Sequence, residues 1–198
     1  MQQNIFYLIP QKTSNGRDIM QKFEDLGFTK VDYDREQRNG FPEVIYGEGK
    51  TVEQISIILG RLIDVHGKAM VTRLSAGKAE VLLQDFPSAK YDEASRILIY
   101  GECEKKWLGK VMVLCAGTSD LPVAEEAAIT AEWMGCDTER LYDVGVAGID
   151  RLLAYREEIT SASVLIVVAG MEGALSSVVS GMVKRPVIAV PTSVGYEI

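Results

Sequence analysis

Three stretches in the second half of the sequence place small and polar residues directly after a run of apolar residues. Residues 117–120 (Gly-Thr-Ser-Asp) follow the run at 111–116, and residues 170–173 (Gly-Met-Glu-Gly) follow the run at 164–169. The dipeptide Thr-Ser follows a third run that ends at Pro191. Glycine lets a ligand approach the backbone, while hydroxyls and the free N–H groups of helix starts bond to phosphate or ribose. The predicted binding residues are Gly117, Thr118, Ser119, Asp120, Gly170, Met171, Gly173, Thr192 and Ser193.

The same residue types also suit a purely structural role. Ser, Thr and Asp are good N-caps for helices, and Gly is common in tight turns between a strand and a helix. For any one stretch, capping explains the residues as well as ligand binding does. Three such stretches at one edge of a sheet favour the binding interpretation.

Glu172 is the strongest candidate for a catalytic residue. It lies in the Gly-Met-Glu-Gly stretch at a predicted helix start. The helix dipole stabilises a carboxylate there by about 0.3–1 kcal/mol, so a role that only complements the dipole is the alternative. If the stretch lines a pocket, Glu172 can act as an acid, a base or the partner of a cation.

A group of charged residues in the first half is a candidate for binding an anion. Arg35, Arg38, Glu43 and Lys50 surround the sequence GFPEVIYGEG, and we expect the three basic residues to bind a carboxylate or a phosphate. A solvated turn is the alternative. The segment is not a P-loop, because the first glycine of that motif would fall at Val44, inside an apparent strand.

Apolar periodicity predicts the elements that must position these residues. In the first half it predicts helices near 16–26, 52–65 and 77–85, and strands at 43–47, 69–74 and 96–100. The second half alternates short apolar runs, which include one at 140–148, with helical patterns such as 121–134. This pattern suits a parallel sheet formed by the apolar runs and covered by helices on both faces. Ligands bind such sheets beyond the carboxyl ends of the strands.

The polar stretch at 101–106 separates two predicted domains. The sequence predicts an α/β protein with an N-terminal tail at residues 1–15 and a small α+β domain at 16–104. Residues 105–198 are expected to form a three-layer α/β/α domain with a mainly parallel sheet.

Composition excludes several classes of protein. The chain has 21 basic and 28 acidic residues and a net charge of −7, which disfavours nonspecific binding to nucleic acid or anionic lipid. Its apolar runs are far shorter than the roughly 18 residues of a membrane span, and the N-terminal sequence lacks the features of a secretory signal. We expect a cytoplasmic protein that binds neither nucleic acid nor membrane. Cys103, Cys115 and Cys136 show no zinc spacing, so no structural metal is expected.

Four blocks of sequence together resemble the LarB family. They are REQRNGFPEVIYGEGKT at 35–51, AGTSDLPVAEEAA at 116–128, VGVAGIDRLL at 144–153 and VVAGMEGALSSVVSGMVKRPVIAVPTSVGY at 167–196. The resemblance runs from about residue 17 to residue 196. The second half is also distantly similar to the PurE family of aminoimidazole ribonucleotide carboxylases and mutases, through the Gly-x-Ser-Asp turn at 117–120.

The resemblance implies a PurE-like second domain and a reaction on nicotinic acid adenine dinucleotide. In that reaction a cysteine thiolate adds to the pyridinium ring, the ring attacks CO2, and loss of the ring proton and of the cysteine restores aromaticity. Hydrolysis of the phosphoanhydride then gives AMP and pyridinium-3,5-biscarboxylic acid mononucleotide, a precursor of a nickel-pincer cofactor. The resemblance places Ser119 and Asp120 at the nucleotide pocket and Glu172 near the reacting ring.

The resemblance also implies how the protein works with other molecules. No tightly bound cofactor is expected, because the pyridinium ring is its own electron sink, and Mg²⁺ is a candidate only for the hydrolysis. The partners expected are the dinucleotide substrate and further copies of the chain, from a dimer to an octamer.

Three departures from the family pattern bear on activity. The family's nucleophilic cysteine is expected beyond Ile198, so we expect a shortened chain with an incomplete sheet that binds the dinucleotide without turnover. Cys115 is the alternative nucleophile, and Asp150 stands where the family often has histidine. The alternatives are a PurE-like carboxylase or mutase, although the second half has no histidine for its Ser-Ala-His-Arg loop, and a non-catalytic nucleotide-binding module.

Overall fold

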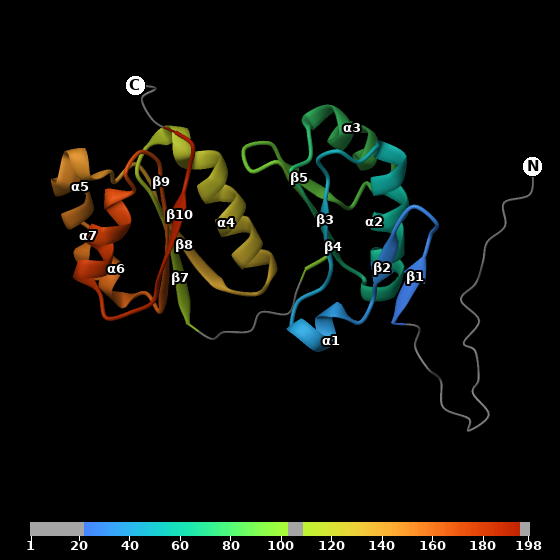
Figure 1. Cartoon of the computed structure of the whole chain (residues 1–198), viewed down its shortest axis with the longest axis horizontal. Coiled ribbons are helices and arrows are strands. Elements are labelled where there is room, and N and C mark those ends of the chain that lie inside the picture. Colours follow the sequence, from blue (N-terminus) through green and yellow to red (C-terminus); the bar gives the residue numbers. More distant parts are fainter. Residues whose placement is uncertain (1–21, 103–108, 195–198) are drawn as a thin grey trace, which may run out of the picture. The chain divides into compact units, whose positions relative to one another are not determined.

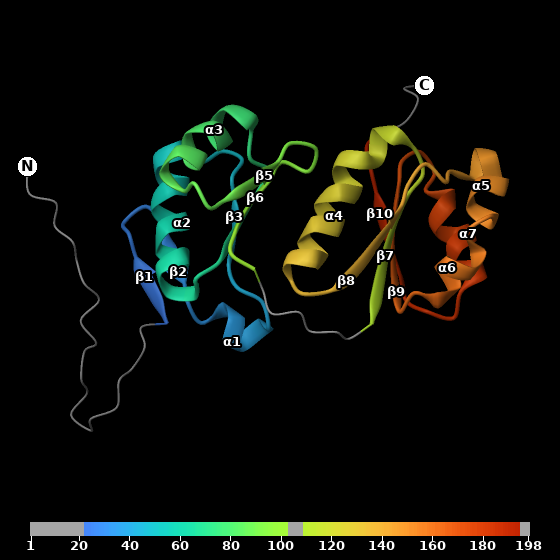
Figure 2. The same cartoon turned by 180° about the vertical axis from the view of Figure 1, so that it is seen from behind.

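The computed structural model describes residues 22–102 and 109–194. The chain divides into two compact units between Glu43 and Val44. Figure 1 colours the elements along the sequence, and Figure 2 shows them from behind. The predicted tail lies outside the described residues. Most of the predicted domain boundary at 101–106 does so too, and this boundary stays a prediction.

The first unit contains a short hairpin and a short helix. Strands β1 and β2 pair antiparallel, and the turn between them uses Gly27 at a φ of 82°. The Gly27 N–H donates to the Asp25 carboxylate at 2.9 Å, which fixes the turn. The helix predicted at 16–26 is therefore wrong within the described residues, where the cross-strand pairs and the glycine turn favour a hairpin. The elements are β1 (Phe23–Asp25), β2 (Lys30–Asp32) and α1 (Arg35–Asn39).

The second unit begins with a mixed sheet in the order β3-β4-β6-β5. Strands β3 and β4 are parallel, while β6 pairs antiparallel with both β4 and β5. A capping box starts α2, because Thr51 and Gln54 exchange hydrogen bonds there. The elements are β3 (Val44–Tyr46), α2 (Val52–His66), β4 (Ala69–Thr72), α3 (Ala76–Asp85), β5 (Lys90–Asp92) and β6 (Ile97–Tyr100). The three strands and two helices predicted here are confirmed, and β5 was not predicted.

The rest of the second unit is a wholly parallel sheet in the order β10-β9-β7-β8. Helix α4 covers one face, and α5, α6 and α7 cover the other (Figures 1 and 2). This confirms the predicted three-layer domain with a parallel sheet. The strands are β7 (Lys110–Cys115), β8 (Asp137–Leu141), β9 (Val164–Ala169) and β10 (Val187–Pro191). The helices are α4 (Leu121–Trp133), α5 (Ile149–Leu153), α6 (Arg156–Ser161) and α7 (Ala174–Met182), with short 3-10 turns η1 (Thr118–Asp120) and η2 (Val146–Gly148).

Small side chains bring α4 close to the sheet. Ala124 and Ala128 are fully buried and pack with Val113 and Val168 of the two central strands. The small side chains on this face of the helix are therefore a packing feature. On the opposite face, Leu165 belongs to the larger core cluster that the other three helices complete. Both faces of β7 and β9 are thus buried, which explains their unbroken apolar runs.

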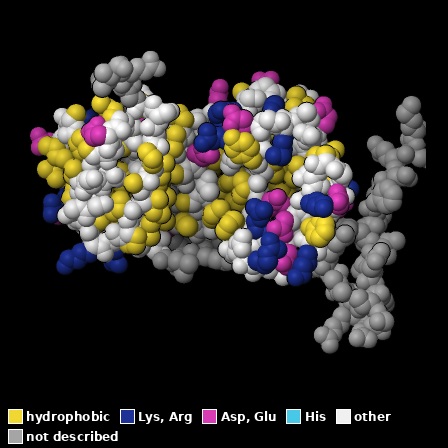
Figure 3. Space-filling model, in the orientation of Figure 1, with side chains coloured by type: hydrophobic (Ala, Val, Ile, Leu, Met, Phe, Trp, Pro, Cys, Tyr) yellow, Lys and Arg dark blue, Asp and Glu magenta, His cyan; other side chains and the backbone are white. Residues whose placement is uncertain are grey.

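The outer strands carry more polar or exposed residues than the central strands. Strand β8 has the sequence Asp-Thr-Glu-Arg-Leu and lies at one edge of the sheet. The strand predicted from the apolar run at 140–148 is wrong, because β8 ends at Leu141 and residues 142–148 follow it outside the sheet. At the other edge, hydrophobic side chains gather on the surface around β10 (Figure 3), where Ile188 is 51% exposed.

Within the described ranges, the helices lack the length and apolar character needed to cross a membrane.

Candidate functional site

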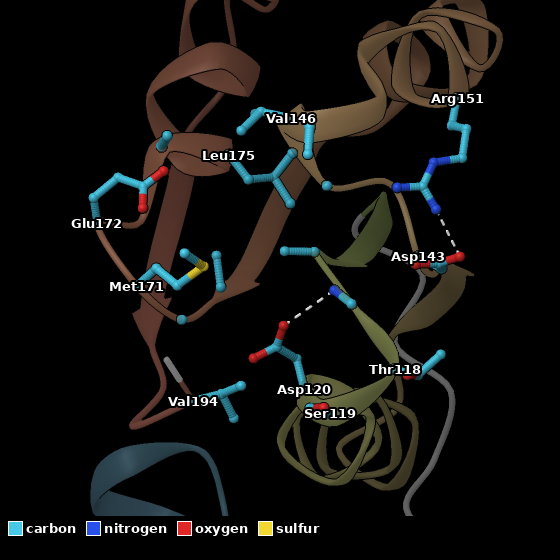
Figure 4. A pocket seen from close by; sticks show the side chains of 17 residues that line it. Thr118, Ser119, Asp120, Asp143, Val146, Arg151, Met171, Glu172, Leu175 and Val194 are labelled. Carbon is cyan, nitrogen blue, oxygen red and sulfur yellow. Dashed lines mark hydrogen bonds and ion pairs between the residues drawn. The ribbon is translucent and has the colours of Figure 1, made fainter. Parts of the chain in front are cut away.

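A pocket of about 580 Å³ lies beyond the carboxyl ends of β7 and β9 (Figure 4). The loops after β7, β8 and β9 form its wall, as expected for an open parallel sheet. It brings together seven of the residues predicted from sequence. These are Gly117, Thr118, Ser119, Asp120, Gly170, Met171 and Glu172.

Asp120 is the buried polar residue of this pocket. Asp120 is 3% exposed, and both of its carboxylate oxygens accept hydrogen bonds. Oδ2 accepts from the Gly117 N–H at 3.1 Å, and Oδ1 accepts from the Thr192 hydroxyl at 2.7 Å. Asp120 therefore holds the loop after β7 against the residue that follows β10. It makes no side-chain capping bond to α4, so capping alone does not explain it.

Gly170 is required by the close approach of two loops. A Cβ at this position would lie 2.0 Å from the carbonyl oxygen of Val194 and 2.9 Å from the Thr192 hydroxyl oxygen. The Met171 N–H donates to that same carbonyl at 2.8 Å. The loop after β9 and the segment after β10 are therefore locked together beside the pocket.

The backbone next to Glu172 presents this residue to the solvent. Met171 and Gly173 both have left-handed backbone angles, with φ of 55° and 68°. A left-handed angle is uncommon for a residue with a side chain, and at Met171 it is held by the hydrogen bond from the Met171 N–H to the Val194 carbonyl. Met171 is 66% exposed and Glu172 is exposed as well. Glu172 is therefore exposed to solvent, and it lines the pocket.

The loop after β8 and the helix α5 that follows it each supply a charged residue that the sequence did not single out. Asp143 and Arg151 line the pocket, and the Arg151 Nη1 lies 2.7 Å from the Asp143 Oδ2. The signal was available in the run Asp-Val-Gly-Val-Ala-Gly-Ile-Asp-Arg, where small residues separate opposite charges. The two charged residues were not chosen as site residues because this run was predicted to be part of a strand. Asp150 is not among the lining residues.

Six predicted site residues do not line the pocket. Thr192 contacts it indirectly through Asp120, while Gly173 and Ser193 adjoin lining residues in the sequence. The others are Arg35, Arg38 and Lys50, which lie in the first unit or near β3. The binding roles of all six stay predictions.

The arginines of the first unit form an ion-pair cluster. Arg38 contacts Asp32 at 2.6 Å and Asp34 at 2.9 Å, and Arg35 lies 3.5 Å from Asp32. The hydrogen bond from Arg38 lowers the pKa of the Asp32 carboxyl below its ordinary value. Charged side chains of both signs gather around α1 in Figure 3. Lys50 donates from Nζ to a backbone carbonyl of β3 at 2.8 Å.

Cys115 is poorly placed to act as a nucleophile. Cys115 is fully buried at the end of β7, and its Sγ donates to the Gly117 carbonyl oxygen at 3.5 Å. Burial raises the pKa of the thiol, so the thiolate that attacks an electrophile is disfavoured. No cysteine of the described residues lines the pocket.

The pocket's carboxylates do not converge on a metal site. In the described residues there is no group of three or more His, Cys, Asp or Glu that could hold a metal ion. Asp120 and Asp143 instead have the partners given above. The residues described do not fit a Mg²⁺ site, and Mg²⁺ in the hydrolysis stays a prediction.

Comparisons with known proteins find a family match for each half of the chain. A family model described as a LarB/PurE-like N-terminal domain matches residues 23–102, and one described as AIR carboxylase matches residues 110–197. An uncharacterized protein of Methanocaldococcus jannaschii is 43% identical over 178 residues, covering 85% of this chain and 70% of the relative. Both halves thus match, in order, the two parts of a carboxylase-type protein. The chain belongs to the LarB family, and its second half is PurE-like.

Proposed function

We propose that the protein carboxylates the pyridinium ring of nicotinic acid adenine dinucleotide and hydrolyses its phosphoanhydride. The products are AMP and pyridinium-3,5-biscarboxylic acid mononucleotide. The observation that carries the proposal is the pocket of a LarB-family chain, which presents the exposed carboxylate of Glu172 beside the ends of β7 and β9. A cationic ring is the ligand that such a carboxylate favours.

In this reaction the protein must position the substrate and supply groups that transfer a proton or stabilise the charged ring. A thiolate adds to the ring, the resulting enamine attacks CO2, a base takes the ring proton, and the thiolate leaves with restoration of the aromatic ring. Glu172 is the group that would accept this proton or stabilise the positive ring. The described residues offer no reactive thiolate at the pocket, because Cys115 is buried and its pKa is raised. We therefore expect the purified chain to bind the dinucleotide, and we expect no turnover from the thiols that the structure describes.

A labelled-substrate experiment tests the proposal. The purified chain is incubated with nicotinic acid adenine dinucleotide and ¹³C-bicarbonate, and mass spectrometry follows AMP and the labelled mononucleotide. Calorimetry measures the affinity for the dinucleotide beside that for aminoimidazole ribonucleotide. We expect tighter binding of the dinucleotide and no labelled product. Labelled product would show that a residue within the chain is the nucleophile, with Cys115 as the first to test.

Preferential binding of aminoimidazole ribonucleotide would contradict the proposal and favour PurE-like chemistry instead. Equal, weak binding of both nucleotides and of AMP would favour a general nucleotide-binding module. Either outcome leaves the family assignment intact, because that assignment rests on the sequence match.

A further inference from the structure

The loops that follow β3 and β4 carry a group of cationic side chains. The two strands are parallel, so their carboxyl ends share one edge of the sheet, which is where ligands bind in α/β sheets. Lys50 follows β3, Arg73 and Lys78 follow β4, and Arg96 lies in the turn between β5 and β6. Figure 3 shows Lys and Arg side chains gathered around α3 and this turn, with acidic ones among them. The residues that line the pocket include none of these four.

The two lysines of the group hold the loop that follows β3. The Lys78 Nζ donates to the Lys50 carbonyl at 2.6 Å, and the Lys50 Nζ donates to the Tyr46 carbonyl at 2.8 Å. Gly47 lies against β4, where an added Cβ would approach the Thr72 carbonyl oxygen to 3.0 Å. The loop is therefore fixed between β4 and α3. The exposed cations of the group are the two arginines.

The backbones of the two arginines are fixed to each other. Arg73 and Arg96 both have left-handed backbone angles, with φ of 53° and 58°. The Leu74 N–H donates to the Arg96 carbonyl at 2.9 Å, and the Arg96 Nη2 donates to the Arg73 carbonyl at 3.3 Å. The Tyr91 hydroxyl donates to the Leu74 carbonyl at 2.9 Å. Strained angles persist where the surrounding contacts define the conformation, so both guanidinium groups start from a rigid frame.

A carboxylate already lies in the field of this group. The Tyr46 hydroxyl donates to the Glu48 Oε2 at 2.6 Å, and both residues are exposed. This hydrogen bond lowers the pKa of the Glu48 carboxyl, and the positive charges of Arg96, Arg73 and Lys78 lower it further. The cations therefore act together on one place, and the charge that they favour there is negative.

We propose that Arg73 and Arg96 form a second anion site, which binds the phosphate group of a small ligand at the shared carboxyl edge of β3 and β4. Forked guanidinium N–H groups match the geometry of phosphate oxygens. Glu48 is the internal competitor for the same positive charge. Arg73 also lies 3.4 Å from the Glu126 carboxylate of α4, a partly exposed pair that contributes little and leaves the guanidinium available. The inference does not depend on the proposed function.

NMR of the arginine Nε–H signals tests the site in the full chain. Inorganic phosphate, ribose 5-phosphate and acetate are titrated separately at one ionic strength. We expect both phosphate-bearing probes to shift the Arg73 and Arg96 signals and to bind at least about fivefold more tightly than acetate, since a phosphate can engage both forks. Tighter binding of ribose 5-phosphate than of inorganic phosphate would identify the ligand as a phosphate ester. Equal affinities would identify the free phosphate group as sufficient.

Variants assign the binding to the two arginines. Arg73→Gln should weaken phosphate binding by about fivefold, and Arg73→Lys by less, because Lys keeps the charge but loses the fork. Glu126→Gln removes the partner of Arg73 without removing the cation, so it should not weaken binding. Arg185→Gln changes an exposed arginine between α7 and β10 and is the matched control, with the wild-type affinity expected.

Glu48→Gln separates an anion site from a structural ion-pair network. Removal of the competing carboxylate should make phosphate bind about threefold more tightly, a gain that a damaged fold does not produce. Circular dichroism checks that each variant is folded. The proposal is overturned if phosphate shifts neither arginine signal, or shifts the Arg151 signal alone. It is also overturned if Arg73→Gln keeps the wild-type affinity, or if Glu48→Gln leaves the affinity unchanged or lowers it.

Discussion

The hydroxyl of Thr192 donates a hydrogen bond of 2.7 Å to the carboxylate of Asp120, a residue 72 positions earlier in the chain. The same carboxylate accepts from the Gly117 N–H, and Asp120 is almost entirely buried. One side chain thereby ties the loop after β7 to the residue after β10. Two of the three stretches predicted to form a site meet at this bond.

Replacing Asp120 by alanine should lower the free energy of unfolding by about 1–3 kcal/mol, because it leaves the partly buried Thr192 hydroxyl and the Gly117 N–H without their acceptor. Urea denaturation followed by circular dichroism measures the change. Ser119→Ala, at an exposed neighbour in the same 3-10 turn, should stay within about 0.5 kcal/mol of the wild type. Equal losses in both variants would show that the Asp120 bonds contribute nothing specific.

A methyl group at Gly170 should be poorly tolerated. The Cβ of Gly170→Ala would meet the Val194 carbonyl oxygen at 2.0 Å, so the loop must move, at a cost of about 1–3 kcal/mol. Gly181→Ala is the matched control, since nothing lies within 4 Å of its Cβ and it sits inside α7. That variant should be neutral or more stable by up to about 1 kcal/mol. Thermal unfolding of the two chains distinguishes them, and a stable Gly170→Ala chain would contradict the contact.

Replacing Glu172 by glutamine should reduce the preference of the pocket for a positively charged ring. We expect Glu172→Gln to bind oxidised nicotinic acid adenine dinucleotide up to about fivefold more weakly, the limit for an exposed ion pair. Its affinity for the reduced dinucleotide, whose ring is uncharged, should not change. Asp150→Asn, an exposed carboxylate outside the pocket lining, serves as the control and should affect neither affinity. A Glu172→Gln chain that weakens both ligands equally would point to a structural role.

The Cys115 thiol should resist alkylation. Its burial and its raised pKa keep the thiolate fraction low at pH 8, whereas Cys136 is only partly buried. Iodoacetamide at pH 8 should therefore modify Cys136 first, with the order read from peptide masses at successive times. Alkylation of Cys115 ahead of Cys136 would revive it as a nucleophile.

The ion pair of the first unit should depend on pH in a defined direction. Arg38 lowers the pKa of Asp32 in the folded chain, so the pair stabilises the fold above the unfolded-chain pKa, and this stabilisation is lost as the pH falls through the folded-state pKa. In Arg38→Gln, NMR titration of the Asp32 carboxyl should show a pKa moved up toward its ordinary range. Arg35→Gln should move it less, because Arg35 lies at 3.5 Å rather than 2.6 Å. A titration curve for Asp32 that is the same in all three chains would disprove the coupling.

Local pattern was sufficient to predict the parallel sheet. Strands β7 and β9 have apolar residues on both faces because helices cover both, so their runs could be recognised without knowledge of the fold. The glycine and hydroxyl stretches could be assigned to one edge for the same reason, since parallel strands share their carboxyl ends. The pocket accordingly contains seven of the predicted residues.

Contacts between distant segments could not be predicted in the same way. The Asp143–Arg151 pair lies in a run that mixes apolar and small residues, and only the edge position of β8 shows where its strand ends. The hairpin β1–β2 replaced a predicted helix because pairing between strands outweighed a short helical pattern. Arg38 was expected to bind an anion, yet its carboxylate neighbours are residues whose proximity only the folded chain reveals.

The bond between Thr192 and Asp120 also bears on how the pocket is completed during folding. It closes a long loop of chain, and such distant contacts carry a larger entropic cost than helix formation or neighbouring strand pairs. The wall of the pocket next to Gly170 exists only after β10 has paired with β9 and Val194 has reached its carbonyl contact. A ligand that binds there selects chains whose last strand is in place. Such a ligand would stabilise the docked position of β10 thermodynamically, by its preference for the complete pocket.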